Sequence, residues 1–160
     1  MAKKRKYLVI HCSAEPNNRA TTGEDIRRWH TNPKDKGGNG WKQVGYETVI
    51  RRDGTVDKLI ESNGDDIVDA WEITNGARGI NSVSAHICLI GGYDEEGNPN
   101  LDMTPEMHDA LVGEIKNYIM EQSDIQIAAH YHFSSKTCPN FPLEEWLEEI
   151  GCAEENIYRG

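Results

Sequence analysis

Potential metal ligands are concentrated near the end of the chain, where His130, His132 and Cys138 share one short segment. His11 follows a short apolar segment near the start. Zinc accepts imidazole and thiolate ligands, and a catalytic zinc site uses three protein ligands and leaves a fourth position to water. These residue types therefore indicate a zinc site, although buried structural histidines are the more common outcome of such spacing. We expect at most one of His130 and His132 to join His11, and the spacing does not say which.

The elements that must position these residues follow from hydrophobic periodicity and capping signals. Thr104 and Pro105 mark the start of a helix over about 105–121, in which apolar residues recur every four positions. A capping pattern at Thr22 predicts a short helix, and an apolar stripe ending at Gly151 predicts a terminal helix. Extended segments are predicted over 7–12, 46–59 (a hairpin), 85–90 and 125–131. Strands interspersed with helices indicate an α/β fold: a single-domain three-layer sandwich around a mixed sheet, spanning 1–160 with its core over about 7–150.

Charge is distributed unevenly along the 160 residues. The formal net charge is −10, yet residues 1–60 hold 13 Lys/Arg against 7 Asp/Glu, and residues 61–160 hold 4 against 20. A net acidic chain is a poor general nucleic-acid binder, because such binding depends on neutralising phosphates. We therefore expect no nucleic-acid partner.

The termini and cysteines bear on location. The basic start is followed by an apolar run too short for a signal peptide, and no segment has the length of a membrane span. We expect synthesis in the cytoplasm, no membrane insertion and a monomer. The four cysteines are expected to be reduced or to bind metal, since nothing in the sequence indicates secretion.

Seven motifs occur in an order that is typical of one family. They are VIHCSA (9–14), IRRWH (26–30), GWKQVGY (40–46), RDGTV (52–56), CLIGG (88–92), TP (104–105) and the segment from AH to KTCP (129–139). Together they resemble the zinc-dependent N-acetylmuramoyl-L-alanine amidases of the bacteriophage T7 lysozyme and peptidoglycan-recognition-protein family. The resemblance spans residues 7 to about 150 and implies a peptidoglycan or muropeptide substrate.

The resemblance also implies roles for five residues. His11, His130 and Cys138 match the zinc ligands of the family, and Tyr46 and Lys136 match its catalytic positions. Amide hydrolysis needs an activated water, which zinc supplies by lowering the pKa of bound water toward about 7. It also needs a stabilised oxyanion, for which the charge of Lys136 and the phenol of Tyr46 are suited. Without the resemblance, a surface lysine and a half-buried tyrosine are the simpler interpretations.

Some positions depart from the family pattern. Glu47 stands where the family commonly has histidine; we expect its side chain to face away from Tyr46, toward the surface or toward substrate. His86 replaces a glycine, and a core or rim histidine is the simplest interpretation. Cys88 aligns with the glutamate base of related recycling amidases, which leaves no glutamate base. No histidine is found over 75–78, where the family often has one.

The leading hypothesis is a zinc amidase that cleaves the bond between N-acetylmuramic acid and L-alanine. A leaderless amidase suits a phage or prophage endolysin that reaches the cell wall through a holin, and a cytoplasmic recycling enzyme is the alternative. A second hypothesis is a recognition domain that binds peptidoglycan without cutting it, although its non-catalytic relatives typically lack the cysteine ligand. A third, a cysteine peptidase that uses Cys138 and His130, leaves His11 and Lys136 unexplained.

Overall fold

A mixed five-stranded sheet organises the protein, whose structure is a computed structural model describing residues 2–160. The strand order is β5-β4-β7-β2-β9; β4 and β5 are antiparallel, and all other neighbours are parallel. The strands are β1 Lys3–Lys4, β2 Tyr7–Cys12, β3 Glu15–Pro16, β4 Thr48–Ile50, β5 Val56–Lys58, β6 Ile67–Val68, β7 Ser84–Leu89, β8 Gly92–Tyr93 and β9 Gln126–Ala129. The helices are α1 Gly23–Thr31, α2 Pro105–Glu121 and α3 Leu143–Glu149.

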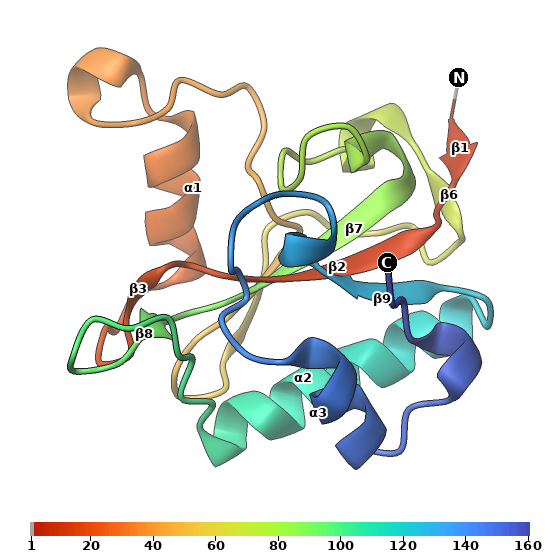
Figure 1. Ribbon diagram of the computed structural model, residues 1–160. Helices are drawn as coiled ribbons and strands as arrows, with labels where there is room; N and C mark the ends of the chain where they lie inside the picture. The colour runs from red at the N-terminus through yellow and green to blue at the C-terminus, as the bar shows by residue number, and fades with distance from the viewer. Residues whose placement is uncertain (1) are drawn as a thin grey trace.

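Helices cover both faces of this sheet (Figure 1). Helices α2 and α3 pack on one face, where the larger apolar cluster includes Leu8, Ile87 and Leu111. Helix α1 lies on the other face over a smaller cluster that includes Ile26 and Val49. This arrangement confirms the predicted three-layer α/β sandwich, and it places β2 and β7 in the middle of the sheet.

The two longer helices begin where their capping residues predict. The Thr104 hydroxyl accepts a hydrogen bond from the Met107 amide at 3.1 Å, and Pro105 occupies the first turn, where its missing N–H costs nothing. Thr22 and Asp25 form a capping box at the start of α1. The capped helix α2 presents fully buried Met107 and Leu111 to the sheet, so the apolar spacing that predicts it is also what holds it there.

The parallel strands β2, β7 and β9 deliver their last residues to one edge of the sheet. Ile10 pairs with Ala129 across β2 and β9, and His11 pairs with Cys88 across β2 and β7. Residues that follow the carboxyl ends of parallel strands meet outside the sheet, where ligand sites of α/β proteins are commonly found. His11 and His130 are therefore brought together by strand register rather than by proximity in sequence.

Two predicted strand boundaries need correction. The strand predicted over 125–131 ends at Ala129, and the 3-10 turn His130–His132 follows it. The hairpin strand predicted from residue 46 begins at Thr48, so Tyr46 lies just before β4. In both places the chain leaves extended backbone next to the residues that could carry chemistry.

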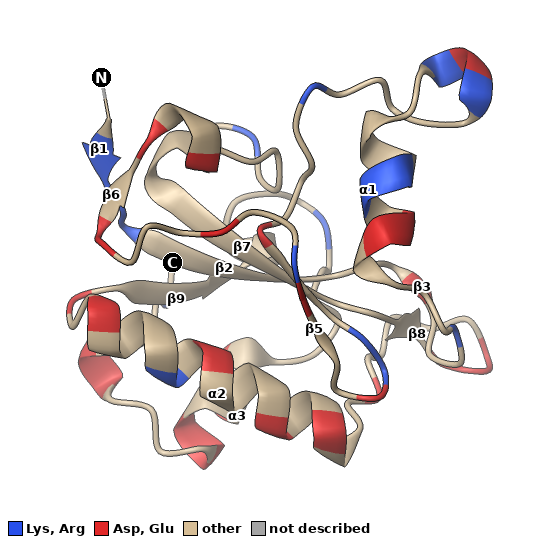
Figure 2. Cartoon of the chain, turned by 180° about the vertical axis from the view of Figure 1, so that it is seen from behind, with Lys and Arg blue, Asp and Glu red and all other residues tan. Residues whose placement is uncertain are grey.

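The charge gradient of the sequence has a spatial counterpart. Acidic residues gather on α2 and α3, whereas basic residues lie on β1, on α1 beside acidic ones, and in the loop that follows α1 (Figure 2). Across residues 2–160, no helix combines the length and apolar character needed to cross a membrane.

Candidate metal centre

Side chains from three segments converge beyond the end of β2. The potential ligand atoms of His11, His130 and Cys138 all lie within 4.8 Å of one another. The two Nδ1 atoms of His11 and His130 are 3.2 Å apart, and the Sγ atom of Cys138 lies 3.9 Å from Nδ1 of His11. We refer to these three residues as the ligand cluster. Of the two histidines near the end of the chain, His130 is the one that joins His11.

Backbone hydrogen bonds hold the cluster in place. The Cys12 amide donates to the Sγ atom of Cys138 at 3.1 Å, which fixes the sulfur against β2. The Tyr131 amide donates to the Cys138 carbonyl at 3.0 Å and closes the loop between His130 and Cys138. The side chain of Cys12 itself belongs to the core on the α2 face, as its position next to His11 predicts.

His132 stays outside the cluster because of the turn at His130–His132. Its Nδ1 atom accepts a hydrogen bond from the Ala129 amide at 3.0 Å, and its Nε2 atom lies 3.6 Å from the Glu144 carboxylate. His132 therefore caps the turn and contacts α3, while His130 faces the cluster.

The protonation preferences of the cluster suit metal binding. Burial lowers the pKa of His11 well below its usual value, and burial followed by the charge of Lys136 lowers that of His130. Both imidazoles are thus neutral near pH 7 and keep a lone pair for a metal. The neighbouring Cys12 side chain and burial raise the pKa of Cys138, which opposes the thiolate that a cysteine peptidase needs. A cation would draw off that proton, so two imidazoles and one thiol fit zinc.

A cavity of about 300 Å³ lies beside the cluster and is lined by His130, Tyr46 and Lys136. The ring of Tyr46 packs against that of His11 with centroids 4.9 Å apart. Burial raises the pKa of Tyr46 well above its usual value, so its hydroxyl remains a hydrogen-bond donor. Lys136 is exposed, and its charge reaches the rings of both His11 and His130.

His30 packs against Tyr46 in the wall of this cavity. Its Nδ1 atom accepts a hydrogen bond from the Gly45 amide at 2.9 Å, and its ring contacts those of Trp41 and Tyr46, with centroid distances of 4.8 and 5.4 Å. In the sequence, Ile26, Trp29 and His30 follow helical spacing, which predicts a buried, hydrogen-bonded histidine at position 30. The histidine is hydrogen-bonded, but it lines the cavity instead of lying in the core.

Sequence reasoning missed a second layer of contacts around His11. His86 is fully buried, and its Nδ1 atom lies 2.9 Å from Nε2 of His11. Burial lowers the pKa of His86 to about 3, so the ring is neutral. The Nε2 atom of His86 lies 3.0 Å from Oδ1 of Asn81. Alternation along β7 could have placed His86 on the same face as the cluster, whereas Asn81, in a 3-10 turn, carries no such signal.

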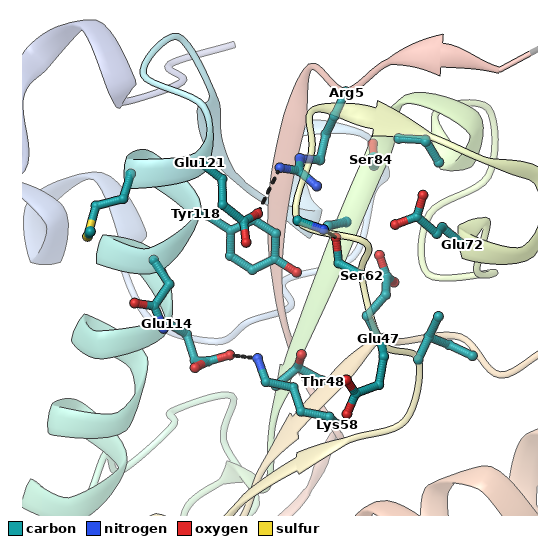
Figure 3. A pocket seen from close by; sticks show the side chains of 17 residues that line it. Arg5, Glu47, Thr48, Lys58, Ser62, Glu72, Ser84, Glu114, Tyr118 and Glu121 are labelled. Carbon is teal, nitrogen blue, oxygen red and sulfur yellow. Dashed lines mark hydrogen bonds and ion pairs between the residues drawn. The ribbon is translucent and has the colours of Figure 1, made fainter.

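A larger cavity, of about 790 Å³, lies between α2, β4 and the segment after β5, and it contains none of the ligand cluster (Figure 3). Glu47 and Glu72 are buried in its wall, with Arg5 and Tyr118 nearby. Glu47 faces away from Tyr46 as predicted, but it is 7% exposed rather than on the surface or at the substrate cavity. Burial raises the pKa of Glu47 to about 8, and the Thr74 hydroxyl donates to its carboxyl group.

Comparisons with known proteins agree with this geometry. Residues 1–141 match a family described as N-acetylmuramoyl-L-alanine amidase. The chain is 37% identical over 141 residues to an endolysin of Enterobacteria phage K11, covering 88% of this chain and 84% of that protein. It is 30% identical over 142 residues to the endolysin of Escherichia phage T7, covering 89% and 85%. The solved structure of the Ph2119 endolysin from a Thermus scotoductus bacteriophage superposes with a TM-score of 0.70 at 25% identity, covering 93% and 86%.

Proposed function

This chain belongs to the N-acetylmuramoyl-L-alanine amidase family and is a peptidoglycan amidase, and from that premise we propose that His11, His130 and Cys138 hold the zinc ion with which it works. The observation that carries the proposal is the convergence of two neutral imidazoles and one thiol from three segments within 4.8 Å. The scissile bond is the amide between the lactyl group of N-acetylmuramic acid and L-alanine.

The chemistry requires a nucleophilic water and a stabilised tetrahedral oxyanion. A bound zinc ion supplies Lewis acidity, which makes a water nucleophilic at neutral pH. The cavity lined by Tyr46 and Lys136 borders the cluster at His130, and a catalytic zinc site keeps one position for water or substrate. The substrate amide enters there, so its carbonyl oxygen faces these two side chains.

Lys136 and Tyr46 then act on the charge that develops on that oxygen. The Lys136 ammonium holds positive charge beside the cluster, and this charge stabilises the oxyanion more than it does the neutral carbonyl of the ground state. The Tyr46 hydroxyl remains protonated and donates a hydrogen bond to the same oxygen. His30 and the packing of Tyr46 on His11 keep that hydroxyl in position.

The phage relatives favour a role in cell lysis. We propose that the protein is an endolysin that acts on the assembled cell wall after release through a holin, as a monomer. A recycling amidase would instead prefer small soluble muropeptides to intact sacculi. Comparing kcat/KM on these two substrates separates the roles, and a strong preference for soluble muropeptides would contradict the endolysin proposal.

Metal removal tests the catalytic proposal directly. Purified protein should contain one equivalent of zinc by elemental analysis, lose hydrolysis of purified peptidoglycan on chelation and regain it when zinc is restored. Appearance of new amino termini reports cleavage. Binding of peptidoglycan without new amino termini would indicate a recognition module, and activity unaffected by chelation would exclude the metal mechanism.

A further inference from the structure

We propose that Asn81 and His86 form a hydrogen-bond relay that keeps the proton of His11 on Nε2 and thereby presents the Nδ1 lone pair to the metal. His86 is a positioning residue in this role, because it touches His11 and not the substrate. The inference rests on the proposed zinc centre for its functional meaning, but its geometric steps are independent of any metal.

The relay starts from a backbone amide whose role has no alternative. The Ala77 amide lies 2.9 Å from Oδ1 of Asn81, and an amide N–H can only donate. The Asn81 atom at this position is therefore the carbonyl oxygen, an acceptor. The Nε2 atom of His86 lies 3.0 Å from the same oxygen and must also donate to it. The proton of His86 is thus on Nε2.

The second step shows that the proton on Nε2 of His86 determines the tautomer of His11. His86 is 0% exposed, and an unpaired imidazolium in such a place would carry a large desolvation cost, so the ring is neutral. With its proton on Nε2, the Nδ1 atom of His86 is an acceptor. It lies 2.9 Å from Nε2 of His11, which must therefore donate. The free lone pair of His11 is then on Nδ1.

The nitrogen that this relay leaves free is the one that faces the ligand cluster. Nδ1 of His11 lies 3.2 Å from Nδ1 of His130 and 3.9 Å from Sγ of Cys138. In the other tautomer, Nδ1 would carry the proton and could not bind a metal. The relay therefore selects the tautomer that the cluster requires.

The fold also makes space for the His86 ring. A Cβ atom at Gly76 would lie 2.5 Å from Nδ1 of His86 and 2.6 Å from its Cγ, closer than real Cβ contacts allow. Glycine at this position leaves the ring free to reach His11. Gly76 and Asn81 thus flank His86, one providing room and the other fixing its proton.

A matched pair of substitutions tests the relay. Asn and Leu have similar shapes, so His86→Asn and His86→Leu lose similar packing, but only asparagine retains an oxygen that can accept from Nε2 of His11. Zinc affinity, measured by competition with a chromogenic chelator, should stay near wild type in His86→Asn. It should fall about 10- to 100-fold in His86→Leu, the range expected for removing a group that orients a metal-binding histidine. Equal affinities for the two folded variants would overturn the proposal.

A second readout needs neither metal nor activity. In zinc-free wild-type protein, ¹H–¹⁵N correlation spectra of the histidine rings should show a protonated Nε2 and an unprotonated Nδ1 for His11. His86→Leu should show a mixture of tautomers. A proton on Nδ1 of wild-type His11 would overturn the relay, whereas wild-type protein that binds no zinc would overturn the metal centre instead. If the position 86 variants fail to fold, Asn81→Leu and its matched control Asn81→Asp, which keeps the oxygen, take their place.

Discussion

Two cavities are lined by polar side chains from the consecutive residues that precede β4, yet only the smaller is built for chemistry. Tyr46 lines the cavity of about 300 Å³ beside the ligand cluster, and the next residue, Glu47, lines the cavity of about 790 Å³ beneath α2. In the larger one, bases already pair with acids: Lys58 with Glu114, and Arg5 with Glu121 at 3.5 Å. In the smaller one, soft ligands converge beside Lys136, which has no acidic partner among the residues that line the cavity. Convergence of potential metal ligands, rather than volume, identifies the site.

The largest expected effect comes from removing the sulfur of the ligand cluster. Cys138→Ser should lose zinc and peptidoglycan hydrolysis together, and activity should fall by more than about 100-fold, because a lost ligand costs more than a lost supporting contact. Zinc content and rate are measured on the same preparation. Cys152→Ser makes the same exchange at a cysteine outside the cluster and should change neither. A full equivalent of zinc in Cys138→Ser would show that the ligand set is wrong.

Removing the charge beside the cluster should have the next largest effect. Lys136→Ala should lower kcat by about 10²- to 10³-fold while zinc stays bound, since it removes a group that stabilises the oxyanion. Lys116→Ala makes the same change of charge on the exposed side of α2 and serves as the control. An unchanged kcat in Lys136→Ala would show that this lysine is a solvated surface residue with no catalytic role.

Tyr46→Phe should have a smaller effect of about 10- to 30-fold on kcat. The Tyr46 hydroxyl donates a hydrogen bond but carries no net charge to offset that of the oxyanion, and the ring packing on His11 is retained in the variant. Steady-state kinetics should show the loss in kcat with KM nearly unchanged. A loss confined to KM would instead assign Tyr46 to substrate binding.

Glu47→Gln, in the larger cavity, should leave activity unchanged and alter only the pH dependence of stability. The folded-state pKa of about 8 exceeds the ordinary value of 4.5, so the folded chain holds a proton that the unfolded chain releases. The contribution of Glu47 is fully present below about pH 4.5 and is lost as the pH rises to about 8. The unfolding free energy of Glu47→Gln relative to wild type should rise over this interval, by up to about 1.4 kcal/mol per pH unit. Urea unfolding at several pH values measures it, and a pH-independent difference would contradict the buried, protonated carboxyl group.

Helix α2 and strand β2 could be predicted because their signals, a helix cap and a run or repeat of apolar residues, lie within the elements themselves. The cap at Thr104 and the apolar repeat of α2 gave bounds that match the structure, and the apolar run of β2 did likewise. The choice between His130 and His132 could not be made from spacing. On a strand, His130 and His132 would be two positions apart and their side chains would share a face. The turn after Ala129 instead directs the two side chains to different places. The resemblance to the amidase family supplied the choice.

Features that depend on register or on packing could not be predicted. The contact between His86 and His11 requires β7 to lie beside β2, and nothing local to either strand specifies its neighbour. Because side chains alternate along a strand, the sequence predicted that Glu47 points away from Tyr46. The burial of Glu47 depends on the packing of α2 and of the segment after β5 around it. Residues that support a site are therefore harder to find from sequence than the residues that form it.

The distance in sequence between the ligands gives the proposed metal a mechanical role. His11 is separated from His130 by 119 positions and from Cys138 by 127, so an ion bound to all three clips the first long strand to the C-terminal part of the chain. Such a clip exists only in the folded state, because the unfolded chain does not hold the three ligands together. At free zinc a thousandfold above its dissociation constant, binding would add about 4 kcal/mol to the free energy of unfolding. Loss of the ion would then lower the stability of the fold and remove the catalyst at the same time.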